Sequence, residues 1–192
     1  MIWVGRSDKF KGERKMKYNE CSYWAEVMVR AKQTAAKVEI GRNGNSDVPE
    51  EVRNSWVKLI DQLRETLQLS AVLIMRLKND EIEVFARSVE DEAYYPVGEK
   101  CGLGHGLYCE TVVGTNQELL VEDASKDKVW ENNPDMAIGM KSYFGVPLHW
   151  SNGAFFGTLC VLDNKKSVNN SLDRELFNDT KERIEKDLAA LE

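Results

Sequence analysis

Apolar positions recur with two different periods along the chain, and the change of period separates helices from strands. Between residues 18 and 40 they lie three or four positions apart, which predicts a helix whose stripe is Trp24, Val27, Met28, Ala31, Ala35 and Val38. A second helix is expected to begin at Ser46 or Asp47, with Pro49 in its first turn. Its apolar stripe is Val52, Trp56, Leu59, Ile60, Leu63 and Leu67.

The middle of the chain predicts strands that alternate with irregular segments. Residues 70–77 form a nearly continuous apolar run, and residues 78–80 turn it into a strand at 81–88 in which Ile82, Val84 and Ala86 share one face. After an irregular stretch, a short helix is expected over residues 107–113, ended by Gly114. A short strand at residues 118–122 and a loop with helical turns over residues 123–140 follow.

A β-hairpin is predicted over residues 142–163. Ser151-Asn152-Gly153 would form a primed turn, because Asn and Gly accept positive φ. Alternate side chains of a strand point to opposite faces. We expect the purely apolar face to lie against terminal helices, and it carries Phe144, Val146, Leu148, Leu159 and Val161. The mixed face should look toward the irregular insert, and it carries Tyr143, Gly145, Thr158 and Cys160.

A final helix is predicted from Ser171 or Asp173 to Leu191, and the whole order of elements is that of an α+β fold with a central antiparallel sheet. We divide the chain into residues 1–46, an N-terminal arm with an extra helix, and residues 47–192, the main domain. Residues 6–17 are locally basic, which is typical of a solvated arm and less often of a binding segment.

Composition narrows the classes of partner and compartment. The net charge of −6 disfavours a general nucleic-acid surface, and no run approaches the roughly 20 apolar residues of a membrane span. Four cysteines without a Cys-x-x-Cys pair, together with two histidines, give no basis for a metal site. We therefore expect a cytoplasmic protein with reduced thiols, no nucleic-acid partner and no membrane contact.

The amino-acid sequence of the hairpin resembles that of a known family. Residues 142–148 read Ser-Tyr-Phe-Gly-Val-Pro-Leu, and residues 157–163 read Gly-Thr-Leu-Cys-Val-Leu-Asp. Both are similar to the last two strands of GAF domains, which are small-molecule sensor modules of bacterial signalling proteins. The resemblance extends over about residues 49–191. It implies a GAF/PAS-like sheet with the N- and C-terminal helices on one face and an irregular loop and short-helix layer on the other.

That irregular layer would form a ligand pocket with the mixed face of the hairpin. The candidate ligand-binding residues are Tyr108, Cys109, Trp130, Met140, Tyr143, Thr158 and Cys160, although packing is the more common role for a buried Cys such as Cys109 and for Trp130 and Met140 in a long loop. Residues 102–106, rich in glycine, precede a helix and either bind an anion or only turn the chain. No catalytic or metal-binding residue is predicted, and the cofactor stays unknown.

Three functions remain open at this stage. The first is a non-catalytic sensor of an unidentified small molecule, as in two-component systems, with output through the terminal helices to an output domain or partner protein outside this chain. We expect a homodimer through those helices, with Phe177, Ile184 and Leu191 seven positions apart. The second is a GAF domain that only dimerises around a vestigial pocket. The third is a free methionine sulfoxide reductase that uses Cys101, Cys109 and Cys160.

Overall fold

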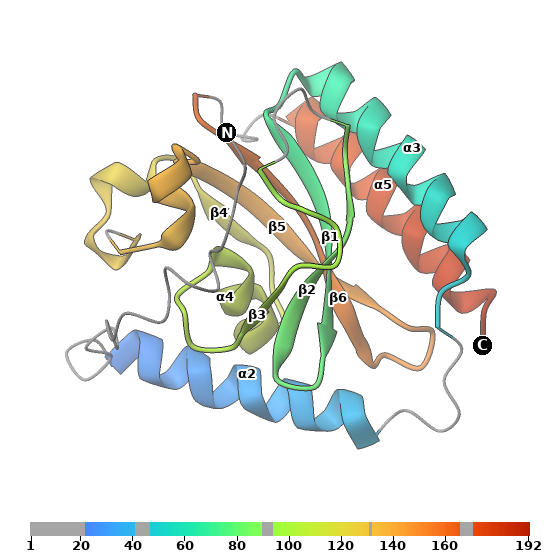
Figure 1. The fold of residues 1–192 in the computed structure, drawn as a ribbon, viewed down its shortest axis with the longest axis horizontal. Helices are drawn as coiled ribbons and strands as arrows, with labels where there is room; N and C mark the ends of the chain where they lie inside the picture. Colours follow the sequence, from blue (N-terminus) through green and yellow to red (C-terminus); the bar gives the residue numbers. More distant parts are fainter. Residues whose placement is uncertain (1–21, 41–46, 90–93, 131, 166–170) are drawn as a thin grey trace.

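The computed structural model describes residues 22–40, 47–89, 94–130, 132–165 and 171–192 (Figure 1). The predicted basic arm at residues 6–17 lies outside these residues. The helices are α2 (Ser22–Ile40), α3 (Glu50–Leu67), α4 (Tyr108–Thr115) and α5 (Ser171–Ala189), with short 3-10 segments η2 (Ala124–Lys126), η3 (Lys128–Trp130) and η4 (Pro134–Ile138). The strands are β1 (Ala71–Lys78), β2 (Glu81–Arg87), β3 (Lys100–Gly102), β4 (Leu119–Val121), β5 (Ser142–His149) and β6 (Phe155–Asp163).

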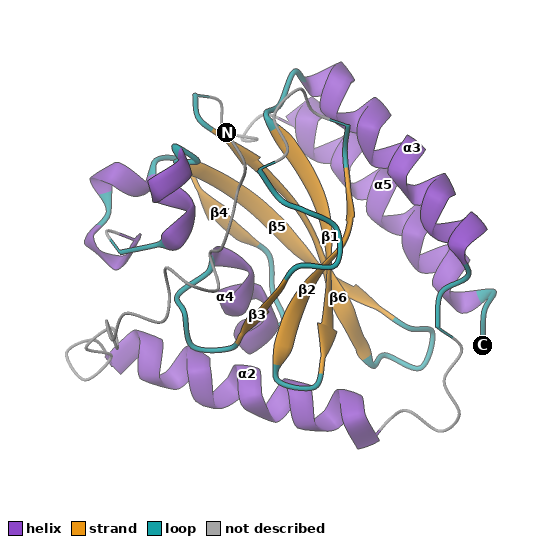
Figure 2. Ribbon diagram, in the orientation of Figure 1, coloured by secondary structure: helices purple, strands orange, loops and turns teal. Residues whose placement is uncertain are grey.

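One six-stranded antiparallel sheet organises the molecule, in the order β3-β2-β1-β6-β5-β4 (Figure 2). The predicted hairpin supplies β5 and β6, and β6 also pairs along its length with β1. The α+β class and the central antiparallel sheet are therefore confirmed. The short edge strand β3 was not predicted, because three residues within an irregular stretch give too little alternation to recognise.

Helices α3 and α5 lie side by side on one face of the sheet (Figure 1). The apolar face predicted for the hairpin packs against them, and Phe144 meets Phe177 of α5 with ring centroids 4.8 Å apart. The Trp56 indole nitrogen on α3 donates to Asp187 of α5 at 3.0 Å. This arrangement confirms the expected layer of N- and C-terminal helices.

The same packing bears on the predicted dimer seam. Phe177 and Ile184 are fully buried against their own sheet and α3, so neither side chain is available to a second copy of the chain. Leu191 is half-buried. The homodimer stays a prediction, and any contact through α5 would use the side of the helix that faces away from the sheet.

The extra helix α2 lies on the opposite face of the sheet, beneath α4 (Figure 1). Its described apolar stripe, Trp24, Val27, Ala31 and Ala35, is buried in the same core as α4 and the pocket face of the sheet. Gly114 does not end α4 as predicted. It lies within the helix, where an added Cβ would come 2.5 Å from the Val27 carbonyl oxygen, and the helix ends at Asn116 in the left-handed region.

Two local predictions are corrected by side-chain hydrogen bonds. Asp47 does not cap α3, since its carboxylate accepts from Arg76 at 2.5 Å and Pro49 takes the N-cap position. In the hairpin, Asn152 accepts the Ala154 N–H through its side chain and only Gly153 has positive φ (79°), so the turn is not primed. Asp47 finds its partner on β1, whereas the Asn152 side chain bonds to the backbone within its own turn.

The strand β2 also departs from simple alternation. Met75 pairs with Val84 and Ile74 pairs with Ala86, so Phe85 is an extra residue in a bulge. The bulge sends both Phe85 and Ala86 to the α3 face, while Ile82 and Val84 remain on the pocket face. Ala86 was predicted to share the face of Ile82 and Val84, and that prediction is wrong.

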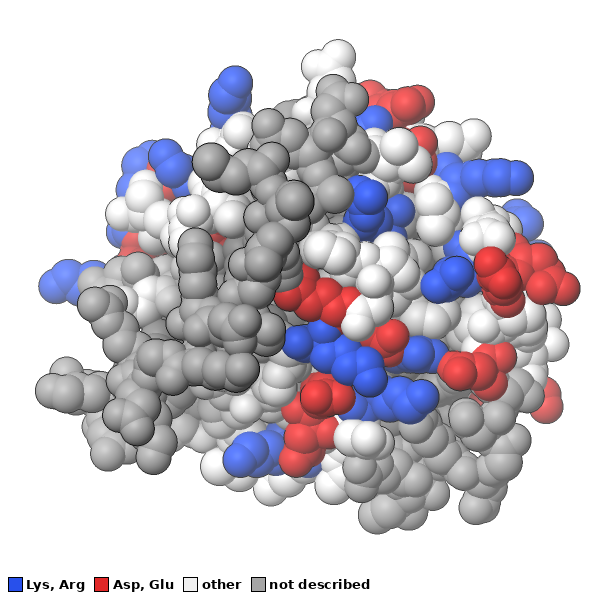
Figure 3. Space-filling view, in the orientation of Figure 1, with Lys and Arg blue, Asp and Glu red and all other residues white. Residues whose placement is uncertain are grey.

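Charged side chains of both signs are interleaved over the face of the molecule shown in Figure 3. The pairs on β1, β2 and β3 include Arg76 with Glu83 at 2.8 Å and Lys100 with Glu81 at 3.8 Å. Within the described part of the chain, none of the helices has both the length and the apolar character that a membrane crossing requires.

We predict that α2 contributes to the stability of the whole domain. Val27→Ala removes two methyl groups from a side chain that is 3% exposed, and should lower the free energy of unfolding by about 2 kcal/mol. Val29→Ala is the matched control, because Val29 lies on the same helix but is 58% exposed, and it should change stability by no more than about 0.5 kcal/mol. Urea unfolding followed by circular dichroism measures both. Equal effects of the two substitutions would show that α2 does not pack on the domain.

Candidate functional site

A cavity of about 180 Å³ lies between the sheet and the irregular insert. Its sheet side is mainly apolar and consists of Leu73, Met75, Ile82, Val84, Tyr143, Cys160 and Leu162. The facing side comes from the segment around β3, from α4 and from η4, and consists of Tyr95, Glu99, Lys100, Cys101, Gly102, His105, Leu107, Cys109 and Asp135. The cavity therefore lies where the mixed face of the hairpin was expected to form a pocket.

Three of the seven predicted ligand-binding residues line this cavity, namely Cys109, Tyr143 and Cys160. Thr158 is buried on the same face but is not part of the lining, and its hydroxyl has no hydrogen-bond partner among the described residues.

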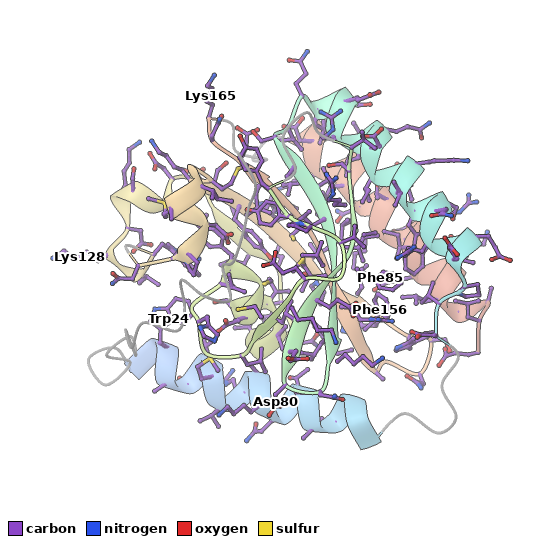
Figure 4. The ribbon with its side chains drawn as sticks, viewed as in Figure 1. Trp24, Asp80, Phe85, Lys128, Phe156 and Lys165 are labelled. Carbon is purple, nitrogen blue, oxygen red and sulfur yellow. The ribbon has the colours of Figure 1, made fainter. Side chains whose placement is uncertain are left out.

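The remaining three, Tyr108, Trp130 and Met140, form the packing beside the cavity. The Tyr108 ring is 5.0 Å from Trp130 and stacks on Tyr143 at 4.9 Å, and the Tyr108 hydroxyl donates to the Met140 carbonyl at 3.5 Å. Trp24 reaches this group from α2 (Figure 4), with its ring 5.2 Å from Trp130 and its indole nitrogen donating to the Val129 carbonyl at 3.2 Å. These contacts hold the insert, α2 and β5 together.

Tyr143 takes the space that Gly145 leaves on the same face of β5. A Cβ at position 145 would lie 2.1 Å from the Tyr143 hydroxyl oxygen, so the ring lies directly over the glycine. Gly145 has no side chain, and the Tyr143 ring fills the space beside it. Tyr143 is 2% exposed, and within the described residues its hydroxyl has no hydrogen-bond partner. A buried hydroxyl in that state is destabilising, and its oxygen has almost no accessible surface although other parts of the residue line the cavity.

Three buried titratable groups of the cavity lining, Tyr143, Cys109 and Cys160, keep their protons at neutral pH. Burial raises the pKa of Tyr143 and of Cys109 well above their ordinary values, and each is raised further by the nearby Cys160. Burial raises the pKa of Cys160 to about 12, and the charge of Asp135 adds to that rise. At neutral pH Tyr143, Cys109 and Cys160 therefore keep neutral O–H and S–H groups in the cavity lining.

The glycine-rich loop before α4 already binds an anionic group, and that group belongs to the chain itself. The carboxylate of Glu110, on a residue with no exposed surface, accepts the backbone N–H of Gly104 at 3.1 Å and of His105 at 3.0 Å. It also accepts the N–H of Leu107 at 3.4 Å, which is the glutamate half of a capping box, while the leucine side chain has no acceptor for the reciprocal bond. Burial raises the pKa of Glu110, while these hydrogen bonds act in the opposite direction.

Two buried polar residues of the cavity were not predicted. The Tyr95 hydroxyl donates to the Asp135 carboxylate at 3.2 Å. Asn133 links their segment to the glycine loop, since its side-chain amide donates to the Gly106 carbonyl at 2.8 Å and its oxygen accepts the Asp135 N–H at 2.8 Å. The sequence Asn-Pro-Asp signals a helical turn, but a local signal does not show which side of the turn faces a cavity.

In the described ranges of the chain, no group of three or more His, Cys, Asp and Glu side chains is placed to hold a metal ion. Cys109 and Cys160 are buried cysteines outside any disulfide bond.

The comparisons with known proteins agree on one fold. Residues 58–185 match the GAF domain family. The GAF domain from Acinetobacter phosphoenolpyruvate-protein phosphotransferase is similar in structure, with a TM-score of 0.57 and 16% identity over 88% of this chain and 95% of that one. No curated protein matches the chain.

Two further solved structures show that different functions occur on this fold. A type II free methionine-R-sulfoxide reductase from Thermoplasma acidophilum has a TM-score of 0.59 and 17% identity over 75% of this chain and 96% of that one. A phycocyanobilin-bound GAF domain from a cyanobacterial phytochrome has a TM-score of 0.60 and 11% identity over 83% of this chain and 94% of that one. At these identities the similarity establishes the fold, and the function has to be argued from the site.

We predict that Glu110→Gln lowers the free energy of unfolding by about 1–3 kcal/mol, because the amide group offers one acceptor oxygen in place of two to the loop N–H groups. Since the folded-state pKa of Glu110 is raised, the folded chain holds this proton more tightly than the unfolded chain does. That contribution to stability is present below the ordinary value of 4.5 and is lost as pH rises through the folded-state pKa.

The glutamine variant lacks this pH dependence, so urea unfolding should show a larger difference from wild type at about pH 4 than at about pH 7. Glu182→Gln, exposed on α5, is the control and should leave both values unchanged. A difference that grows with pH would mean that the loop hydrogen bonds outweigh burial at Glu110.

Proposed function

The chain belongs to the GAF domain family, and on that premise we propose that it is a non-catalytic sensor that binds a small molecule in the cavity between its sheet and α4. The observation that carries this proposal is the cavity itself, with the unpartnered Tyr143 hydroxyl in its lining.

Both features oppose stability in a protein that has no ligand to bind. Protein interiors are close-packed, and voids larger than a water molecule are few. Empty apolar volume weakens a core, and an unsatisfied buried hydroxyl costs about 1–3 kcal/mol. A ligand that fills the volume and pairs with the hydroxyl would offset both costs. The cavity is therefore better explained by a working pocket than by a vestigial one.

The hairpin offers a direct route from the cavity to the helices on the far side of the sheet. Tyr143 lines the cavity, while its neighbour Phe144 packs on Phe177 of α5. A shift of β5 on ligand binding would therefore move the side chains that pack on α5. We propose that this helix transmits the signal to a further domain or partner chain. A homodimer through the exposed side of α5 would be one means of reading that shift.

A second candidate is cysteine-dependent reduction of free methionine sulfoxide. It is favoured by one observation, that Cys101, Cys109 and Cys160 line a single cavity. The electrostatics oppose it, because the thiolate is the reactive form and burial raises the pKa of both Cys109 and Cys160. We therefore propose that these thiols pack and donate hydrogen bonds and do not perform catalysis.

We predict that the protein does not turn over free methionine-R-sulfoxide in the presence of dithiothreitol. Methionine formation, followed by chromatography, should equal that of a Cys109→Ser, Cys160→Ser double variant. Turnover by wild type that the double variant lacks would overturn the non-catalytic proposal.

Ligand binding itself can be tested with a cavity-filling variant. We predict that some member of a library of small neutral, anionic and cationic metabolites raises the melting temperature, and that Cys160→Met removes the effect because the longer side chain enters the cavity. A ligand at 100 times its Kd should stabilise wild type by about 2.7 kcal/mol.

Val161→Ile is the matched control, because Val161 lies on the same strand but packs toward α3 and α5. It should keep the response to the same compounds. A library that leaves wild type unchanged, or that stabilises Cys160→Met equally, would favour the vestigial pocket.

A further inference from the structure

We propose that the ligand of this cavity is an uncharged, mainly apolar molecule that presents a hydrogen-bond acceptor, such as a carbonyl oxygen, to the Tyr143 hydroxyl. The inference rests on the proposed sensor function and narrows it to one chemical class. Three independent features of the site support it. The backbone N–H groups of the glycine-rich loop are already occupied, the Tyr143 hydroxyl has no partner among the described residues, and the walls of the cavity are mainly apolar.

The backbone N–H groups that would hold an anion are already occupied by a side chain of the protein itself. A glycine-rich loop at a helix N-terminus is a common anion-binding device, and here the N–H groups of Gly104, His105 and Leu107 point to the carboxylate of Glu110. A phosphate or carboxylate ligand would have to displace a buried carboxylate from these donors. Asp135 also lines the cavity, and its negative charge opposes a second one.

The polar group without a partner is a neutral donor. Among the described residues, no group meets hydrogen-bond geometry at the enclosed Tyr143 hydroxyl, and the group that acts on it at short range is the Cys160 thiol, a weak partner. The thiols of Cys109 and Cys160 lie beside it in the lining and remain protonated at neutral pH. The oxygen is covered in the structure, so an acceptor atom of the ligand would satisfy the phenolic O–H after a movement of the Tyr143 ring. An ammonium group has no acceptor to offer it, and the Asp135 carboxylate already accepts from Tyr95 at 3.2 Å.

The walls set the size and polarity of the rest of the molecule. The sheet side of the cavity is formed largely by Leu73, Met75, Ile82, Val84 and Leu162. The volume of about 180 Å³ is similar to an engineered apolar cavity of about 150 Å³ that binds benzene. The charged pair Lys100 and Glu81 lies at the edge strand β3, where both side chains are about half exposed and solvated. A ring the size of benzene with one small substituent fits these limits.

Four probes of nearly equal shape test the class directly: acetophenone, its hydrocarbon analogue α-methylstyrene, benzoate and 1-phenylethylamine. By calorimetric titration of the full chain, acetophenone should bind about tenfold more tightly than α-methylstyrene, because only the ketone accepts from Tyr143. Benzoate and 1-phenylethylamine should bind more weakly than either neutral probe, because each would bury a charge.

Two tyrosine variants assign the preference to a single hydroxyl. Tyr143→Phe should bind both neutral probes equally, and without ligand it should unfold at the same temperature as wild type or higher, since it loses a hydroxyl that had no partner. Tyr108→Phe is the matched control. Tyr108 stacks on Tyr143 but does not line the cavity, so this variant should keep the tenfold preference.

Each alternative outcome has a definite meaning. Tighter binding of benzoate or 1-phenylethylamine would overturn the uncharged class and leave the sensor function standing. Equal binding of the two neutral probes to wild type would overturn the role of the acceptor. Binding of none of the four would overturn the inference as a whole, and the metabolite library with Cys160→Met then decides separately whether the cavity is a sensor pocket.

Discussion

The rest of the site depends on one contact, in which the Tyr143 ring packs over Gly145. Gly145 has no side chain, so the Tyr143 ring can lie against its own strand with the hydroxyl oxygen directly over the glycine. In that position the ring stacks on Tyr108, which in turn contacts Trp130 and, through it, Trp24 of α2. One residue of β5 therefore joins the sheet, the insert and the extra helix, and it also lines the cavity that they enclose. The cavity is a consequence of this stack, because the aromatic side chains hold α4 and the 3-10 segments beside the sheet.

The molecule has two hydrophobic cores, one on each face of the sheet, and they differ in packing and polarity. The core under α3 and α5 is apolar and closely packed, with Trp56, Phe144, Phe177 and Leu159 nearly or fully buried. The core on the other face contains the cavity, the free thiols and the unpartnered hydroxyls of Tyr143 and Thr158. A dense layer on one side supplies stability, and this allows the other side to keep volume and polar groups that would weaken a single core. Helix α2 adds apolar burial to the weaker side.

Much of this arrangement could be predicted from the sequence, for a specific reason. Strand side chains alternate strictly, so the two faces of the hairpin followed from residue parity alone, and Phe144 and Tyr143 lie on the faces expected for them. Helical periodicity located α2, α3 and α5 but did not show what each stripe packs against, and α2 lies on the pocket face. The role of Glu110 was not predictable, because a glutamate three residues after a helix start is equally common on an exposed surface. Tyr95 and Asp135 meet from segments 40 residues apart, a distance that no local pattern bridges.

The central claim is that the volume beside Tyr143 is open to a small uncharged molecule. Diffraction from a crystal held under xenon pressure tests it most directly, since xenon enters apolar cavities without needing a hydrogen bond. The account predicts a xenon atom in contact with Tyr143, Cys160 and Leu162 in the wild-type crystal, and no xenon there in Cys160→Met. A wild-type crystal in which side chains such as Met75 fill that volume, and in which no xenon is found, would contradict it.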